Sequence, residues 1–129
     1  MKASLLYKFL SGDINTQQLK IEIDEEIAAF RVKLKLHKKG GSLPISIEDD
    51  LEFTFKSEYL LKLCDHYLNE ELDNVEFEYI ADCIILREPD DYENEELVDL
   101  LESMTDPKVN GVITKERIAR IKNDFIFFS

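Results

Sequence analysis

Two stretches of the chain, residues 5–19 (LLYKFLSGDINTQQL) and residues 63–77 (LCDHYLNEELDNVEF), repeat one pattern of apolar and polar residues. Each has apolar residues at helical spacing, then a short polar turn, one apolar residue and a second helix. A repeat of this kind is typical of a helical hairpin that is used twice. It therefore predicts a mainly helical protein. The matched pairs are Leu5 and Leu63, Leu6 and Cys64, Phe9 and Tyr67, Leu10 and Leu68, Ile14 and Leu72, and Leu19 and Phe77.

The first hairpin extends into a long apolar stripe. Gly12 is a natural end for the first helix, and the second helix is expected to begin near Asn15 or Thr16. The spacing predicts one helix over residues 16–38, ending at the sequence HKKGG. An alternative stays open, because residues 30–36 (FRVKLKL) also alternate as a strand would. The stripe consists of Leu19, Ile23, Ile27, Phe30 and Leu34.

Residues 45–55 change to a period of two. Apolar and polar residues alternate on either side of Glu48-Asp49-Asp50, which predicts a short β-hairpin with its turn at the acidic residues. Because two strands alone are marginally stable, one face of this hairpin should lie on the helices. The alternating apolar residues are Ile45, Ile47, Leu51, Phe53 and Phe55.

The rest of the chain reads as helices separated by turns. Ser57, Asn94 and Thr114 are each placed to cap a helix, and Asp73 with Glu76 forms a capping box. Loops are expected at residues 87–93 (REPDDYE) and 105–111 (TDPKVNG). The sequence thus predicts one mainly helical α+β domain over residues 1–129, with about five or six helices in hairpins and one short β-hairpin.

The charge of the chain limits its partners. Sixteen Lys and Arg residues against 28 Asp and Glu residues give a net charge of −12, which disfavours nucleic acid and anionic membranes and favours basic proteins. An alternative is that the acidity serves solubility alone. The chain has no apolar run long enough to span a membrane, and Lys8 interrupts its first apolar stretch, so we expect a cytoplasmic protein.

Cys64-Asp65-His66 is the one stretch that suggests a nucleophile with its base. In the repeat, however, Cys64 takes the place of the apolar Leu6. His66 is two residues further on, about 200° around a helix, and so lies on another face. The acidic stretch 90–96 (DDYENEE) lacks the pattern of a calcium loop, and no phosphate-binding or hydrolase motif is present. We therefore expect neither an enzyme nor a protein that holds a metal or a cofactor.

Acidic residues gather in two regions, residues 69–78 with Asp82 one turn on, and residues 88–96. Both regions include a tyrosine, and exposed tyrosines among carboxylates suit the recognition of a basic protein. The alternative is an ordinary solvated helix face. The predicted partner-binding residues are Glu70, Glu71, Asp73, Glu78, Tyr79, Asp82, Asp90, Asp91, Tyr92, Glu95 and Glu96.

Residues 57–125 resemble small acidic bacterial proteins that are found beside polymorphic toxins. The resemblance rests on the segments YLNEELD…YIAD and TDPKVNGVIT. These are the immunity proteins of contact-dependent growth inhibition and related toxin–antitoxin-like systems. The resemblance implies a cytoplasmic inhibitor that binds a cognate toxin, often a basic nuclease, and occludes its active site. It assigns no binding residues. One departure is Glu70, which stands where the turn after Asn69 would favour a glycine.

Two other binding functions stay open. In one, the chain is a nucleic-acid mimic that inhibits DNA-binding proteins, which requires carboxylates at phosphate-like spacing. Alternatively it is an adaptor or oligomer subunit, since its tail Phe125-Ile126-Phe127-Phe128 is apolar enough to form a homodimer contact.

Overall fold

The computed structural model describes residues 1–36, 47–48, 50–86, 92–105 and 113–128, without the side chains of residues 34–36 and 126–128. Seven helices and no β-strand are found in this part of the chain, so the predicted α+β class is wrong and the fold is helical. The helices are α1 (Ala3–Ser11), α2 (Thr16–Glu22), α3 (Asp24–Leu36), α4 (Ser57–Leu68), α5 (Asn74–Ile85), α6 (Glu95–Ser103) and α8 (Lys115–Phe128).

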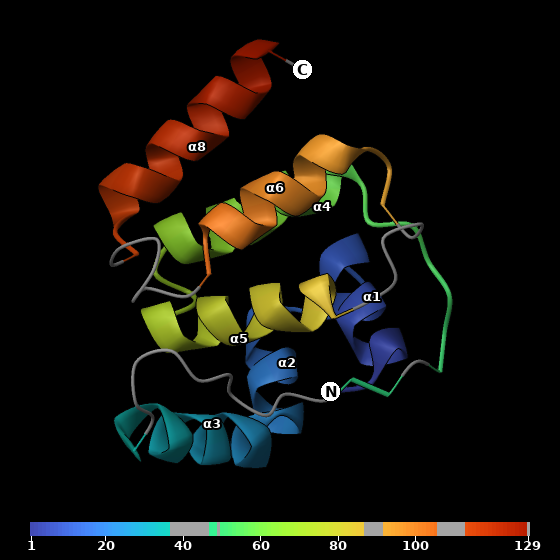
Figure 1. The fold of residues 1–129 in the computed structure, drawn as a ribbon. Helices are drawn as coiled ribbons and strands as arrows, with labels where there is room; N and C mark the ends of the chain where they lie inside the picture. The colour runs from blue at the N-terminus through green and yellow to red at the C-terminus, as the bar shows by residue number, and fades with distance from the viewer. Residues whose placement is uncertain (37–46, 49, 87–91, 106–112, 129) are drawn as a thin grey trace.

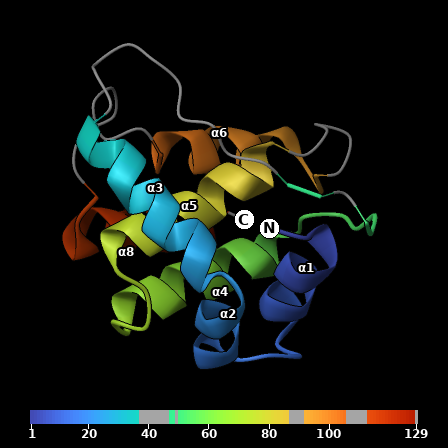
Figure 2. The same cartoon turned by 90° about the horizontal axis from the view of Figure 1, so that it is seen from below.

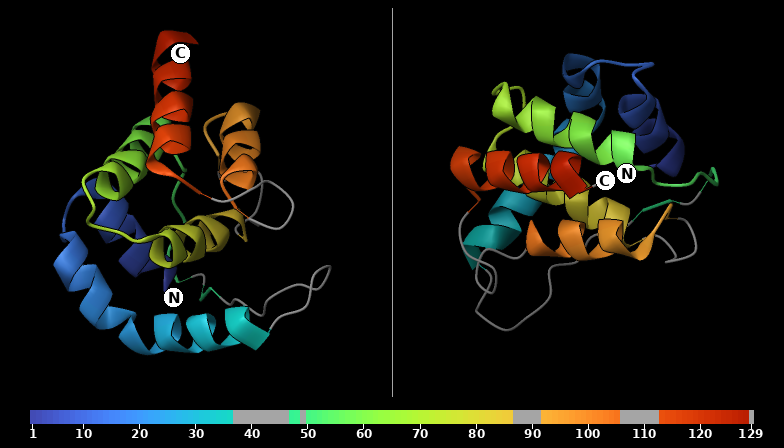
Figure 3. Two further views of the ribbon diagram at one scale, coloured as in Figure 1. Left: turned by 90° about the vertical axis from the view of Figure 1, so that its left-hand side faces the viewer. Right: turned by 90° about the horizontal axis from the view of Figure 1, so that it is seen from above.

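Helices α4 and α5 form the middle of the molecule, and the other helices pack around them. Helix α3 lies along one side of α5, and α6 lies along the other side (Figure 1). Helices α1 and α8 both pack against α4, and α2 joins α1 to α3 (Figure 2). In the left view of Figure 3, α6 and α8 stand on the opposite side of α5 from α3. This order leaves one face of α2 and one face of α6 at the surface.

The core combines the apolar faces of both predicted hairpins in one cluster. Leu6 and Phe9 of α1 and their repeat partners Cys64 and Tyr67 of α4 are all buried. Each fully buried Leu or Phe contributes roughly 1.5–3 kcal/mol of transfer free energy. The apolar pattern of the repeat therefore corresponds to the observed core.

The two hairpin turns also share their backbone geometry. The carbonyl of Lys8 accepts hydrogen bonds from the amides of residues 13 and 14, with N–O distances of 2.8 and 3.2 Å. The carbonyl of His66 does the same with residues 71 and 72, at 2.9 and 3.3 Å. Gly12 and Glu70 hold matching positions with φ of 90° and 64°. The internal repeat predicted from the sequence is thus a repeat of structure.

Both hairpins begin their second helix with a capping box. The side chain of Asn15 accepts the amide of Gln18 at 2.8 Å, and the side chain of Gln18 accepts the amide of Asn15 at 2.9 Å. Asp73 and Glu76 make the equivalent pair of bonds at 2.8 and 2.9 Å. The predicted start near Asn15 and the predicted Asp73–Glu76 capping box are confirmed.

The predicted single helix over residues 16–38 is divided. Helix α2 is closed by its C-cap Ile23, whose φ and ψ are −107° and 12°, and α3 begins at once at Asp24. Ile23 and Ile27 are buried, so the stripe faces the core across the break. Residues 30–36 are helical, and the strand alternative is wrong. Residues 37 and 38 lie outside the described part of the chain.

The predicted β-hairpin at residues 45–55 is wrong. The described residues of this segment form two isolated bridges, Lys2 with Glu48 and Phe55 with Tyr92, and pair with no neighbouring strand of their own. The alternation has another cause. Phe53 lies with its ring 5.1 Å from Tyr7, and Phe55 lies 6.1 Å from Tyr59, so both rings join an aromatic cluster on the helices. Ile45 and Asp49 lie outside the description.

Carboxylates from residues outside the helices cap two of them. Ser57 was expected to cap α4, but it is the first residue of that helix, and its amide donates to Glu93 at 3.1 Å. Asp50, expected in a hairpin turn, accepts the amide and the hydroxyl of Ser4 in α1 at 2.9 and 2.6 Å. These bonds satisfy amides that have no partner within the helix.

The other predicted caps are confirmed. Asn94 accepts the amide of Leu97 at 3.2 Å, and Thr114 accepts the amide of Arg117 at 3.1 Å.

Candidate functional site

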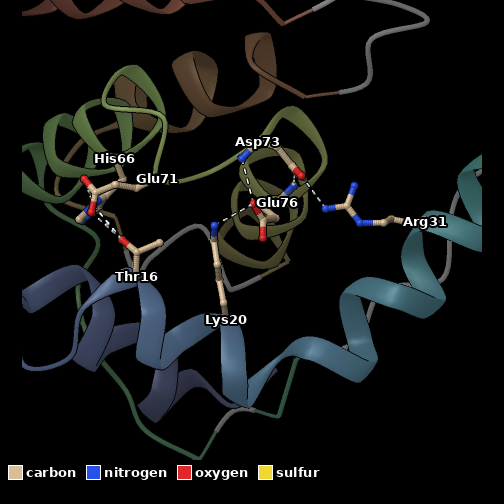
Figure 4. Close-up of polar contacts among 7 residues, drawn as sticks. All are labelled: Thr16, Lys20, Arg31, His66, Glu71, Asp73 and Glu76. Carbon is tan, nitrogen blue, oxygen red and sulfur yellow. Dashed lines mark hydrogen bonds and ion pairs between the residues drawn. The ribbon is translucent and has the colours of Figure 1, made fainter.

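The first predicted acidic region, residues 69–78 with Asp82, covers the turn between α4 and α5 and much of α5. We call residues 69–76, the turn with the first residues of α5, the acidic turn. Three cations from three other helices reach it. The guanidinium of Arg31 lies 2.6 Å from the carboxylate of Asp73, and Lys20 lies 3.5 Å from Glu76 (Figure 4). Lys115 pairs with Glu70. These carboxylates are therefore compensated within the fold.

Glu71 of the acidic turn belongs to a small polar cluster with His66 and the buried Thr16 (Figure 4). The hydroxyl of Thr16 donates to Glu71 at 3.2 Å, and Nδ1 of His66 lies 3.3 Å from the other carboxylate oxygen. Nδ1 of His66 also lies 3.2 Å from the Thr16 hydroxyl, so the three side chains contact one another. The His66 ring also stacks on Phe9, with 4.7 Å between centroids. The cluster joins the two hairpins to each other.

Glu70 occupies the left-handed region of backbone space, at φ 64°. A residue with a Cβ is strained there, and glycine is the usual choice, as at Gly12 in the first hairpin. The Glu70 side chain is 74% exposed and paired with Lys115, whose hydrogen bond and charge lower the pKa of Glu70. The charge of Glu70 thus stabilises the turn only weakly, because the ion pair is exposed. Its backbone conformation destabilises the turn.

The side chains of Cys64, Asp65 and His66 make separate contacts. Cys64 is buried, and burial raises the pKa of its thiol to about 12. Asp65 pairs with Lys122 of α8, and His66 is directed to Thr16 and Glu71. Cys83, the second buried thiol, also has its pKa raised to about 12 by burial. The absence of a catalytic role for the trio stays a prediction.

Glu78 and Tyr79 of the predicted binding set lie in the interior. Tyr79 is 5% exposed, and its hydroxyl donates to Glu26 at 2.6 Å. Burial, with that hydrogen bond, raises the pKa of Tyr79 above its ordinary value. Glu78 is 6% exposed, and Asp82 is half-buried. The expectation of an exposed tyrosine in this region is therefore wrong.

Tyr92, the tyrosine of the second predicted region, is half-buried. Its hydroxyl donates to the carbonyl of Ile84 at 2.6 Å, and its ring lies 5.9 Å from Phe55. Both contacts hold the segment that precedes α6 against the core, and the partner-binding role predicted for Tyr92 stays a prediction. Asp90 and Asp91 lie outside the described residues, and their predicted role stays a prediction.

The apolar tail is described only in part. Phe125 is buried in the core. The side chains of residues 126–128 lie outside the description, so the homodimer contact predicted for the tail stays a prediction.

The outer face of α6 carries Glu95, Glu96 and Asp99, which we call the α6 acidic face. Helix α6 buries Leu97 and Leu101 on its inner side, and the three carboxylates on the other side are exposed. Among the residues that the structure describes, none of the three takes part in an ion pair. Glu95 and Glu96 also favour helix formation in the first turn of α6.

The described residues of the predicted set therefore lie in different environments, with Glu78 and Tyr79 in the interior. The acidic turn is occupied by intramolecular contacts, whereas Glu95 and Glu96 face solvent. Sequence reasoning missed Asp99, although its place four residues after Glu95 puts both on one helix face. It also missed the cations Lys20, Arg31 and Lys115, which no local pattern connects to the acidic turn.

Two surface hollows of about 590 Å³ each are present among the described residues. One adjoins the acidic turn and is lined by its ion pairs. The other lies between α1 and α2. In the same part of the chain, no three His, Cys, Asp or Glu side chains are placed to hold a metal ion together, and no helix has the length and apolar character needed to cross a membrane.

Comparison with protein-family models, curated proteins and solved structures gives no match.

Proposed function

We propose that this protein is a cytoplasmic immunity protein, which binds a basic toxin domain and neutralises it without turnover. The observation that carries the proposal is the α6 acidic face, where Glu95, Glu96 and Asp99 are exposed and unpaired in the described part of the chain. The resemblance of residues 57–125 to immunity proteins of polymorphic toxin systems supports the same function.

The physical mechanism is steering followed by occlusion. A net charge of −12 attracts a basic surface from a distance, and the α6 acidic face supplies carboxylates that need not break an existing ion pair to bind. A nuclease toxin carries positive charge where it binds phosphate. An acidic inhibitor seated on that surface would exclude the nucleic acid substrate.

The first test identifies the partner. The protein, immobilised as bait, is exposed to extract of its native host at low and then at high salt. We expect one basic protein to be retained, to arrest bacterial growth when expressed alone, and to lose this toxicity when the chain is co-expressed. Retention of several DNA-binding proteins that are all released by salt would instead favour a nucleic-acid mimic, and a partner without toxicity would favour an adaptor.

The second test locates the surface. A variant with Glu95→Lys, Glu96→Lys and Asp99→Lys should associate with the partner about tenfold more slowly at low salt. The matched control carries Asp13→Lys, Asp24→Lys and Glu25→Lys, an equal change of charge at exposed positions outside α6. Equal loss of rate in both variants would mean that net charge alone, and not the α6 acidic face, steers the partner.

A further inference from the structure

A second surface, far in the sequence from α6, has features that the proposed function does not use. It is the hollow of about 590 Å³ between α1, α2 and the first turn of α3. In the view from below, α1, α2 and α3 follow one another along this side of the molecule (Figure 2). We call this hollow with its rim the α1–α2 groove.

The α1–α2 groove combines a protruding apolar side chain with an apolar recess. Ile21 on α2 lines the groove and is 72% exposed, more than the other exposed large apolar side chains of the described residues. Beside it, Leu5 of α1 and Ile14 of the first turn are only partly buried and form the recess. Removal of such an exposed apolar side chain from water favours association.

The polar rim of the α1–α2 groove has two signs of charge. Two lysines line it, Lys8 in α1 and Lys2 at the N-cap of α1. Two glutamates line it as well, Glu22 in α2 and Glu26 in α3. In the described part of the chain, no ion pair joins Lys8 or Glu22 to another residue. Lys8 on α1 and Glu22 on α2 thus offer opposite charges at the rim, whereas Glu26 is already paired with the amino group of Met1.

We propose that the α1–α2 groove binds the same groove of a second copy of this chain. A two-fold axis brings one patch against itself, so each feature must find its complement within the patch. Ile21 of one copy then enters the recess beside Leu5 and Ile14 of the other, and the reverse contact forms at the same time. The same rotation sets Lys8 of each copy against Glu22 of the other.

This dimer does not depend on the immunity function, because the α6 acidic face contributes nothing to it. Two chains of charge −12 repel each other at long range, and the local pairs of opposite charge offset that repulsion only at contact. The dimer is therefore expected to be weak and to become stronger when salt screens the net charge.

The first experiment is sedimentation velocity of the full chain from low micromolar to near-millimolar concentration. The wild type should form dimers in a concentration-dependent manner, and Ile21→Asp should weaken association at least tenfold. Val32→Asp is the matched control, because Val32 is 57% exposed on α3 and does not line the groove. A wild type that stays monomeric, or equal weakening by both variants, would overturn the proposal.

A charge exchange tests the two-fold arrangement itself. Lys8→Glu and Glu22→Lys should each reduce self-association, because each sets like charges against one another. Mixing the two variants should restore dimers, since both contacts of the mixed pair again set a lysine against a glutamate. Circular dichroism of each variant checks that the helices are kept. Failure of the mixture to associate better than either variant alone would contradict the proposed pairing.

Discussion

The acidic turn and the α6 acidic face look alike in the sequence but have different physical roles. In the acidic turn, Asp73 is bound by Arg31 at 2.6 Å and also caps α5 through the amide of Glu76. On α6, Glu95 and Glu96 have no ionic partner among the described residues. The difference teaches that a count of carboxylates does not locate a binding surface. Carboxylates that are already paired stabilise the fold, and those without partners remain available.

The largest expected change in stability comes from substitution of the helix caps. Asp73→Ala removes the capping bond and the Arg31 pair, and should lower the free energy of unfolding by about 1–2 kcal/mol. Urea denaturation measures the change. Asn15→Ala, the equivalent substitution in the first hairpin, should cost about 1 kcal/mol.

The matched control for the caps is Glu96→Ala on the α6 acidic face, with an expected change within about 0.5 kcal/mol. If this control were as destabilising as Asp73→Ala, the division between paired and available carboxylates would be wrong.

The next largest change in stability is expected at Gly12 and Glu70, the residues with positive φ in the two turns. Gly12→Ala should destabilise the protein by about 1 kcal/mol, because alanine is disfavoured at φ 90°. Among the described residues, a Cβ at this position would contact only the Lys62 amino group, at 4.0 Å, so the cost lies in the backbone conformation and not in a clash with a neighbouring residue. Glu70→Gly should change stability in the opposite direction, since it relieves the same strain. Thermal unfolding of both variants gives the sign, and a destabilised Glu70→Gly protein would show that the Lys115 contact outweighs the backbone.

A smaller effect appears in the acid range. Lys115 lowers the pKa of Glu70. Partial burial alone would raise the pKa of Asp73, but the Glu76 amide and Arg31 lower it overall. A lowered folded-state pKa adds stability above the unfolded value, and this stability is lost as pH falls through the folded value. From about pH 5 to about pH 2, the wild type should therefore lose more stability than a Glu70→Gln, Asp73→Asn variant.

The control for the acid effect is Glu95→Gln with Glu96→Gln, which removes the same number of carboxylates. Chemical denaturation at a series of pH values compares the three proteins. A control that abolishes the acid sensitivity as fully as the turn variant would contradict the assignment of paired groups to the acidic turn.

Local signals in the sequence were enough to place most helix ends. Gly12, Asn94 and Thr114 act within a few residues of their own position, and each behaves as predicted. The break at Ile23 escaped prediction because the apolar stripe continues across it. The acidic residues that open α3, Asp24 and Glu25, were the available sign of a new helix start.

Tertiary contacts explain the remaining errors. Phe53 and Phe55 are two residues apart, as apolar residues of a strand would be, but their rings pack in an aromatic cluster on the helices. Tyr79 was expected at the surface because of its acidic neighbours, but α5 buries it against Phe30 of α3. The ion pairs of the acidic turn join helices that lie far apart in the chain, so no local pattern reveals them.

The most direct measurement of the difference between the two acidic regions is a backbone-amide NMR titration of the protein with a lysine-rich peptide at low salt. We predict the larger chemical-shift changes and line broadening at Glu95, Glu96 and Asp99, and smaller changes across the acidic turn. Addition of salt should reverse both. Larger changes in the acidic turn than on the α6 acidic face would contradict the claim that the fold has already paired the carboxylates of the turn.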